Sequence, residues 1–132
     1  MTKVLIDTNI YSFAMKGDAA VVNALRKMDR IGFSAVSIGE LLSGFKGGTR
    51  EAQNREELHL FLDSPRVVLH PIGGETADFY ASILINLREA GTPIPTNDIW
   101  IAASAFQHGY KLFTRDRHFN FIPGLVLLQG EI

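Results

Sequence analysis

Five short apolar runs, most of them separated by segments with helical periodicity, constrain the fold of this chain more than any other feature. They lie at residues 3–6, 32–36, 66–70, 110–114 and 125–128. Continuous apolarity over so few residues is typical of strands buried on both faces. Parallel strands need crossover connections, and helices between the runs supply them. The sequence therefore predicts an α/β fold with a mostly parallel five-stranded sheet and helices on both faces.

The helical segments are recognised by their apolar spacing and by residues that begin or end a helix. Asp18 is a plausible N-cap, and Ser37-Ile38-Gly39-Glu40 has the form of a capping box. Gly91 and Gly109 stand just past two of the expected ends. The expected helices cover about residues 10–15, 19–28, 38–45, 49–62, 75–88 and 96–108.

The segment from Thr96 to Phe106 has almost no polar break, so a helix here should be buried on nearly every face. Asp98 nevertheless lies in its first turn. A carboxylate at that position interacts favourably with the helix dipole and can cap free N–H groups. Taken alone, Asp98 therefore has a purely structural interpretation.

Length and composition predict one domain over residues 1–132. The 13 basic and 14 acidic side chains give a net charge of −1, which argues against a protein that binds polyanions over its whole surface. The absence of cysteine excludes disulfides and thiolate metal sites and is consistent with a cytoplasmic protein. No apolar stretch reaches about 18 residues, so neither a signal peptide nor a membrane-spanning segment is expected, and no association with a membrane.

Four acidic residues are expected at the carboxyl edge of the sheet. Asp7 and Asp116 follow apolar runs directly, and Glu40 and Asp98 lie in the first turns of helices that start at the same edge. In parallel sheets, ligands bind beyond the carboxyl ends of the strands. Each acid also has a plainer interpretation: Asp7 as a helix cap, Glu40 as part of a capping box, and Asp116 as a turn residue.

Converging carboxylates need a cation. Two unit charges about 4 Å apart repel by roughly 4 kcal/mol at an effective dielectric constant near 20. Oxygen ligands without a histidine or cysteine cluster favour a hard divalent ion, Mg²⁺ or Mn²⁺. The chemistry that suits such a site is phosphodiester hydrolysis, in which the metal polarises the phosphate, supplies a hydroxide and stabilises the leaving oxygen.

Several motifs in this order resemble the PIN-domain ribonucleases, and most closely the VapC toxins of prokaryotic toxin–antitoxin pairs. The resemblance spans essentially the whole chain. It is carried by Asp7-Thr8-Asn9, Ser37-Ile38-Gly39-Glu40-Leu41-Leu42, Asn97-Asp98-Ile99-Trp100-Ile101-Ala102-Ala103, Leu112-Phe113-Thr114-Arg115-Asp116, Phe119 and Ile122-Pro123-Gly124-Leu125.

The resemblance implies a three-layer α/β/α sandwich with strand order 3-2-1-4-5 and a metal-dependent endoribonuclease. It implies a homodimer, an RNA substrate and inhibition by a small cognate antitoxin that inserts a segment into the active site. It also implies roles for individual residues. Asp7, Glu40, Asp98 and Asp116 would bind the metal, and Thr8, Asn9 and Thr114 would hold the strand ends and the metal waters.

Further side chains have open interpretations. Arg115, together with Lys46, Arg50 and Arg117, could contact the RNA backbone or be a solvated charge. Many relatives carry another acid where this chain has His118, which could contact phosphate or metal, or be an inert surface histidine. His59, His70 and His108 show no ligand spacing and are interpreted as structural.

Two other functions compete with the nuclease. Asp7 stands where the nucleophile of an aspartyl-phosphate phosphatase would be, although Asn9 replaces the second acid that this chemistry needs. A non-catalytic module of the same fold that binds RNA or protein is the other alternative, although such a module gains nothing from clustered negative charge.

Overall fold

The computed structural model describes residues 1–129. Its elements, in chain order, are β1 (Lys3–Ile6), α1 (Thr8–Met15), α2 (Ala19–Arg26), β2 (Arg30–Ser34), α3 (Ala35–Lys46), α4 (Glu51–Leu62), β3 (Val67–His70), α5 (Gly74–Ala90), α6 (Thr96–His108), β4 (Lys111–Phe113), the 3-10 helix η1 (Arg117–Phe121) and β5 (Leu127–Leu128).

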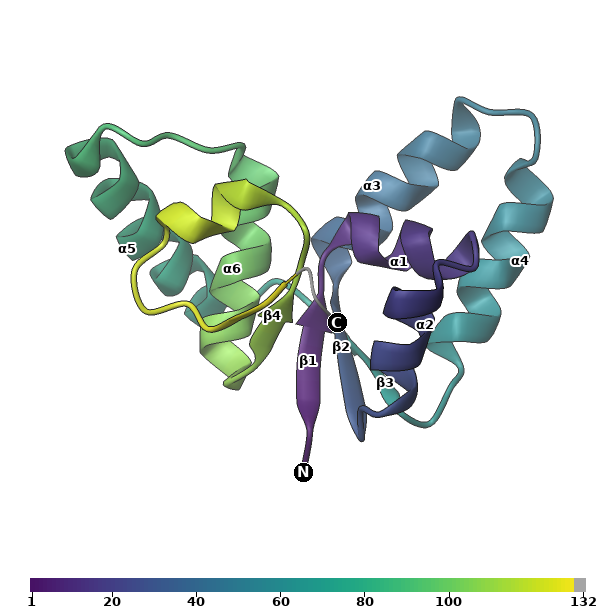
Figure 1. Cartoon of the computed structure of the whole chain (residues 1–132). Coiled ribbons are helices and arrows are strands. Elements are labelled where there is room, and N and C mark those ends of the chain that lie inside the picture. The colour runs from purple at the N-terminus through teal and green to yellow at the C-terminus, as the bar shows by residue number, and fades with distance from the viewer. Residues whose placement is uncertain (130–132) are drawn as a thin grey trace.

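The strands form one parallel sheet in the order β3-β2-β1-β4-β5. This confirms the predicted fold class and strand order. The order reverses between β1 and β4, which are neighbours with Val4 beside Lys111 and Ile6 beside Phe113. The carboxyl ends of these two strands therefore lie side by side, as Figure 1 shows at the upper end of the sheet.

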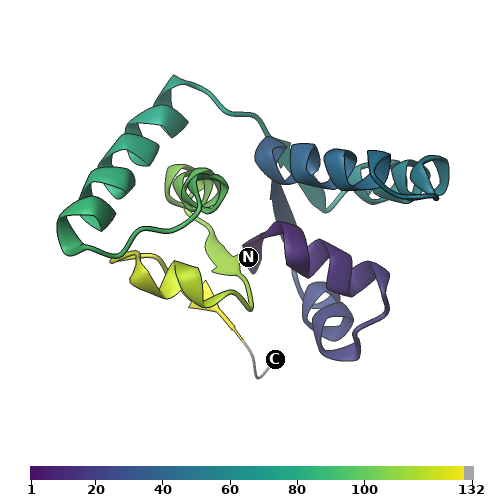
Figure 2. The same cartoon turned by 90° about the horizontal axis from the view of Figure 1, so that it is seen from above.

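Helices cover both faces of the sheet because side chains alternate along each strand. Leu5 belongs to the apolar cluster beneath α5 and α6, whereas Val4 and Ile6 belong to the cluster beneath α1 to α4. Figures 1 and 2 show the two groups of helices standing on opposite sides of the strands. The result is the predicted three-layer sandwich, with residues from both layers meeting at the carboxyl edge.

The boundary between β2 and α3 differs from the prediction. The strand covers Arg30–Ser34 and not residues 32–36, and α3 begins at Ala35. The cause is Ser34, whose side chain accepts a hydrogen bond from Val36 N and caps the helix. Ser37 is therefore inside the helix, the predicted capping box is wrong, and Glu40 lies in the second turn and not the first.

The other predicted elements are confirmed with small shifts at their ends. Helix α1 starts at Thr8, two residues earlier than predicted, because Asp7 caps it. Helix α6 has the predicted burial, and Gly91 and Gly109 end α5 and α6 in the left-handed conformation. The short helix η1 was not predicted. Within residues 1–129, no helix is long and apolar enough to cross a membrane.

Candidate active site

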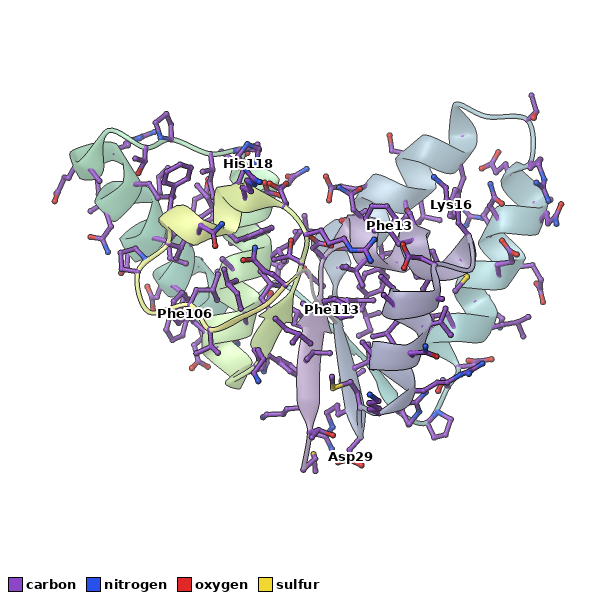
Figure 3. The ribbon with its side chains drawn as sticks, viewed as in Figure 1. Phe13, Lys16, Asp29, Phe106, Phe113 and His118 are labelled. Carbon is purple, nitrogen blue, oxygen red and sulfur yellow. The ribbon has the colours of Figure 1, made fainter. Side chains whose placement is uncertain are left out.

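The predicted acidic residues meet at the carboxyl ends of β1 and β4. They surround a hollow of about 80 Å³. Figure 3 shows this end of the sheet, with His118 near it and Asp29 at the opposite end. The hollow is lined by Asp7, Thr8, Asn9, Glu40, Asp98, Ile101 and Asp116.

Asp7 is the most buried of the four acids, with 4% of its surface exposed. Its Oδ1 accepts a hydrogen bond from Ile10 N at 2.9 Å, so it is also the cap of α1, as its plainer interpretation predicted. Its Oδ2 accepts one from Thr114 Oγ1 at 2.5 Å. The pKa of Asp7 is raised to about 6. Burial is the largest cause, the two hydrogen bonds oppose it, and the charges of Asp116 and Asp98 add to it.

Glu40 is held by two donors from other elements. Thr8 Oγ1 donates to Oε1 at 2.6 Å, and Asn97 Nδ2 lies 3.3 Å from Oε2. The sequence indicated a role for Thr8 but assigned none to Asn97. The signal for Asn97 was its place directly before Asp98 in the first turn of α6, which brings it to the same sheet edge.

Asp98 and Asp116 both lie close to His118. His118 Nδ1 lies 3.3 Å from Asp98 Oδ2 and 3.2 Å from Asp116 Oδ1. Burial raises the pKa of Asp98, the charge of Asp116 adds to this effect, and His118 opposes it. Asp116 also accepts a hydrogen bond from His118 N at 2.9 Å, which caps η1.

These contacts divide the predicted site residues into two sets. In the part of the chain that the structure describes, the side chains whose ligand atoms gather within 4.8 Å of one another are Asp98, Asp116 and His118. Asp7 and Glu40 line the same hollow outside that group. The position of His118 therefore favours its functional interpretation over that of an inert surface histidine.

The predicted contact from Arg115 to RNA competes with a structural contact. Its guanidinium forms two hydrogen bonds with Asp18, at 2.7 and 3.1 Å, and lies over the ring of Phe13. Lys46 pairs with Glu51, and Arg50 donates to Gln53. These cations are therefore already engaged within the protein.

The other histidines, which were interpreted as structural, do not line the hollow. His70 stacks on His108 and its Nε2 lies 2.7 Å from the hydroxyl of Tyr110, whereas His59 pairs with Asp63 on the surface of α4. A wider hollow of about 620 Å³ lies at the opposite edge of the sheet, and none of the described residues that line it carries a carboxylate.

The donor set fits a divalent cation. Four carboxylates face one small hollow, and two of them, Asp7 and Asp98, have pKa values raised by burial and by the charge of Asp116. Among the hydrogen bonds and ion pairs of residues 1–129, none joins these four carboxylates to a lysine or arginine. A bound cation would supply the missing positive charge.

Comparison with known proteins identifies the family of this fold. The family model described as "PIN domain" matches residues 4–125. Ribonuclease VapC2 of Rickettsia felis is 28% identical over 128 residues, covering 93% of this chain and 94% of that protein. VapC ribonuclease Y4jK of Sinorhizobium fredii is 30% identical over 122 residues and covers 86% of each chain.

Solved structures agree with these relatives. VapBC2 from Rickettsia felis, bound to a DNA fragment from its promoter, superposes with a TM-score of 0.87 at 26% identity and covers 97% of this chain and 98% of that chain. VapBC-1 from nontypeable Haemophilus influenzae gives a TM-score of 0.86 at 25% identity with the same coverage. The chain therefore belongs to the PIN-domain family, and its relatives within that family are VapC ribonucleases.

Proposed function

We propose that this protein is a metal-dependent endoribonuclease and the toxin of a VapBC-type toxin–antitoxin pair. The observation that carries this proposal is the convergence of Asp7, Glu40, Asp98 and Asp116 on one hollow at the carboxyl edge of the sheet. The relatives that resemble it over most of their length are named ribonucleases, which supports RNA as the substrate.

The four acids would hold the divalent ion, Mg²⁺ or Mn²⁺. When bound, this ion supplies polarisation of the scissile phosphate and activation of a water molecule. The protein contributes fixed positions for its ligands. Thr114 and the Ile10 amide hold the two oxygens of Asp7, while Thr8 and Asn97 hold those of Glu40. Because these hydrogen bonds already exist, the carboxylates need little reorganisation when a cation and a phosphate arrive.

The partners follow from the same comparisons. Structural neighbours of this chain are complexes of a VapC-type toxin with its antitoxin, which supports a small antitoxin as the protein partner. We further propose that residues 1–132 form one domain, that two copies form a homodimer, and that the protein acts in the cytoplasm.

The phosphatase alternative is disfavoured by the surroundings of Asp7. Asn9 lines the hollow beside Asp7 and stands where this chemistry needs a second acid, and an amide cannot donate the proton that such an acid supplies. A non-catalytic binding module is disfavoured for a different reason. Burial of like charges in one hollow is unfavourable, and such a module would gain nothing from keeping them.

The decisive experiment compares Asp98→Asn with Asp78→Asn, a matched change at an exposed carboxylate on α5. Purified protein is incubated with structured RNA, and with a DNA of the same sequence, in Mg²⁺ or Mn²⁺ and in EDTA. RNA cleavage by the wild type should require the ion. Loss of several kcal/mol of transition-state stabilisation in Asp98→Asn should slow cleavage by roughly 100-fold or more. Asp78→Asn should cleave as the wild type does.

Cleavage that persists in EDTA, or that is equal in Asp98→Asn and the wild type, would overturn the proposal. The partner is tested separately by co-expressing the product of any short reading frame beside the gene. A cognate antitoxin should co-purify with the chain and suppress cleavage, and Asp98→Asn should still bind it.

A further inference from the structure

His118 combines an exposed ring with one nitrogen that is directed into the acidic site. It is the second residue of η1, and 48% of its side chain is exposed. Its Nδ1 faces Asp98 Oδ2 at 3.3 Å and Asp116 Oδ1 at 3.2 Å. The backbone of His118 is held beside Asp116, because His118 N donates to Asp116 Oδ1 at the start of η1. The ring nitrogen therefore shares one small space with two carboxylate oxygens.

The two distances from His118 Nδ1 are close to those between neighbouring ligands around one ion. Ligand atoms about 2.1 Å from a cation and at right angles to each other are about 3 Å apart. The two distances from Nδ1 are close to this value, and all three ligand atoms lie within 4.8 Å of one another.

A nitrogen ligand changes which ion a site prefers. Mg²⁺ is bound in proteins almost entirely through oxygen, whereas imidazole binds first-row transition ions, with affinity rising from Mn²⁺ to Co²⁺. An all-carboxylate site has this bias to a smaller degree, because carboxylates also suit Mg²⁺. One imidazole beside two carboxylates therefore predicts that the site prefers some divalent ions over others, and not only that it binds them more tightly.

We propose that His118 Nδ1 is a direct ligand of the divalent ion, together with Asp98 and Asp116, and that it biases the site towards Mn²⁺ and Co²⁺ over Mg²⁺. This inference rests on the proposed metal-dependent function. It assigns His118 to the metal and not to the RNA phosphate.

The first test is a direct measurement of the ligand atom. Mn²⁺ alone is added to the wild-type protein, and electron spin-echo modulation is used to detect coupling between the ion and a ¹⁴N nucleus. Coupling typical of imidazole is expected in the wild type and in His59→Ala, which removes an exposed histidine on α4 far from the site. The coupling should be absent in His118→Ala and in His118→Asp.

The second test measures selectivity by calorimetric titration of the same proteins with Mg²⁺, Mn²⁺ and Co²⁺. His118→Ala should weaken Mn²⁺ binding by about tenfold and Co²⁺ binding by more, while Mg²⁺ binding changes by about threefold or less. His118→Asp replaces the nitrogen with oxygen and should bind Mg²⁺ at least as well as the wild type. A residue that only supported the local structure would weaken all three ions equally.

The outcomes separate this inference from the function on which it rests. Mn²⁺ binding without nitrogen coupling in the wild type, or an equal loss for all three ions in His118→Ala, would overturn the role of His118 and leave the metal-dependent nuclease intact. Absence of any binding that depends on Asp98 would instead overturn the proposed function itself.

Discussion

Asn97 Nδ2 lies 3.3 Å from Glu40 Oε2, and this hydrogen bond joins the first turn of α6 to the second turn of α3. The two helices belong to opposite layers of the sandwich (Figure 2). The contact therefore fixes the position of one carboxylate relative to Asp98, which follows Asn97 in the chain. Thr8 holds the other oxygen of Glu40.

Replacing Asn97 with alanine should weaken metal binding without unfolding the protein. Its side chain is exposed, so the change creates no cavity. Glu40 would keep only the hydrogen bond from Thr8, and loss of an orienting partner typically weakens metal binding by 10-fold to 100-fold. We expect about a tenfold rise in the dissociation constant for Mn²⁺ by titration calorimetry, and slower RNA cleavage at limiting Mn²⁺.

The matched control for this change is Asn23→Ala, at an exposed position on α2. It should bind Mn²⁺ as the wild type does. Equal affinities for Asn97→Ala and Asn23→Ala would mean that Glu40 is positioned without Asn97.

The buried carboxyl of Asp7 should make the stability of the metal-free protein depend on pH. Its pKa is about 6 in the folded protein, above the ordinary value of 3.8, so the folded state retains a proton that the unfolded state has lost between these values. The contribution of Asp7 to stability is therefore greatest below about pH 4, falls as the pH rises to about 6, and is constant above that. The difference corresponds to about 3 kcal/mol.

Asp7→Asn removes this ionisation and should stabilise the protein in EDTA at pH 7.5 by up to about 3 kcal/mol. Below pH 4 the two proteins should be equally stable, because Asp7 is then protonated in both states. Urea denaturation at several pH values measures the difference, with the exposed Asp78→Asn as the control. Saturating Mn²⁺ should reverse the order, because it stabilises a folded protein that binds it. If Asp7→Asn were more stable than the wild type by the same amount at pH 4 and at pH 7.5, the ionisation of Asp7 would not be the cause of the difference.

The pattern of apolar runs was sufficient to predict the α/β class and the parallel sheet, because strand burial on both faces leaves a local signature. The strand order was implied by the family resemblance and not by this pattern. The pattern was sufficient for Asp7, directly after β1, and for Asp116, three residues after β4, since residues that closely follow parallel strands lie at the carboxyl edge. The sequence predicted correctly that Glu40 lies at the carboxyl edge of the sheet, but it predicted the first turn of the helix, whereas Glu40 lies in the second turn of α3. The capping motif at Ser37 was equally acceptable locally, and only the competing cap at Ser34 decided where α3 begins.

His118 and Asn97 show what the sequence could not decide. Each contact joins segments far apart in the chain, 20 positions for His118 and Asp98 and 57 for Asn97 and Glu40. No local rule states which way an exposed histidine in a 3-10 turn points. In the structure, His118 N donates to Asp116 Oδ1, and the ring nitrogen Nδ1 lies 3.3 Å from Asp98 Oδ2.

The sequence also could not decide the role of Arg115. Here the structure shows a contact within the protein, with Asp18, and not a side chain directed into the acidic site. Its pairing with Asp18 raises the pKa of Arg115 and lowers that of Asp18, so both groups remain charged at neutral pH. The pair joins the end of β4 to the start of α2. Arg115→Met should therefore lower the urea midpoint, and the combined Arg115→Met/Asp18→Asn variant should lose less than the sum of the two single changes.

Arg117→Met, at an exposed neighbouring position, is the control and should leave the urea midpoint unchanged. If Arg115 instead bound RNA, Asp18→Asn would free its guanidinium and strengthen RNA binding. Stronger RNA binding by Asp18→Asn would thus contradict the structural role of Arg115.

Gly32 in the central part of β2 is required by the ring of Tyr110, which crosses over it. A Cβ atom at this position would lie 2.7 Å from Tyr110 Cζ and 2.9 Å from the hydroxyl oxygen. The ring cannot easily move, because it is buried and its hydroxyl lies 2.7 Å from His70 Nε2. Gly32→Ala should therefore destabilise the protein by about 1–3 kcal/mol in urea denaturation, as overpacking of a core does.

The matched control is Gly44→Ala, where a Cβ atom meets nothing within 4 Å in the exposed part of α3. The same chemical change should there stabilise the protein by about 0.5–1 kcal/mol, because glycine is unfavourable within a helix. Adding Tyr110→Leu should make Gly32→Ala nearly neutral relative to Tyr110→Leu alone, because the atoms that it meets are gone. A cost of Gly32→Ala that is unchanged by Tyr110→Leu would show that the strain arises from the strand itself and not from the ring.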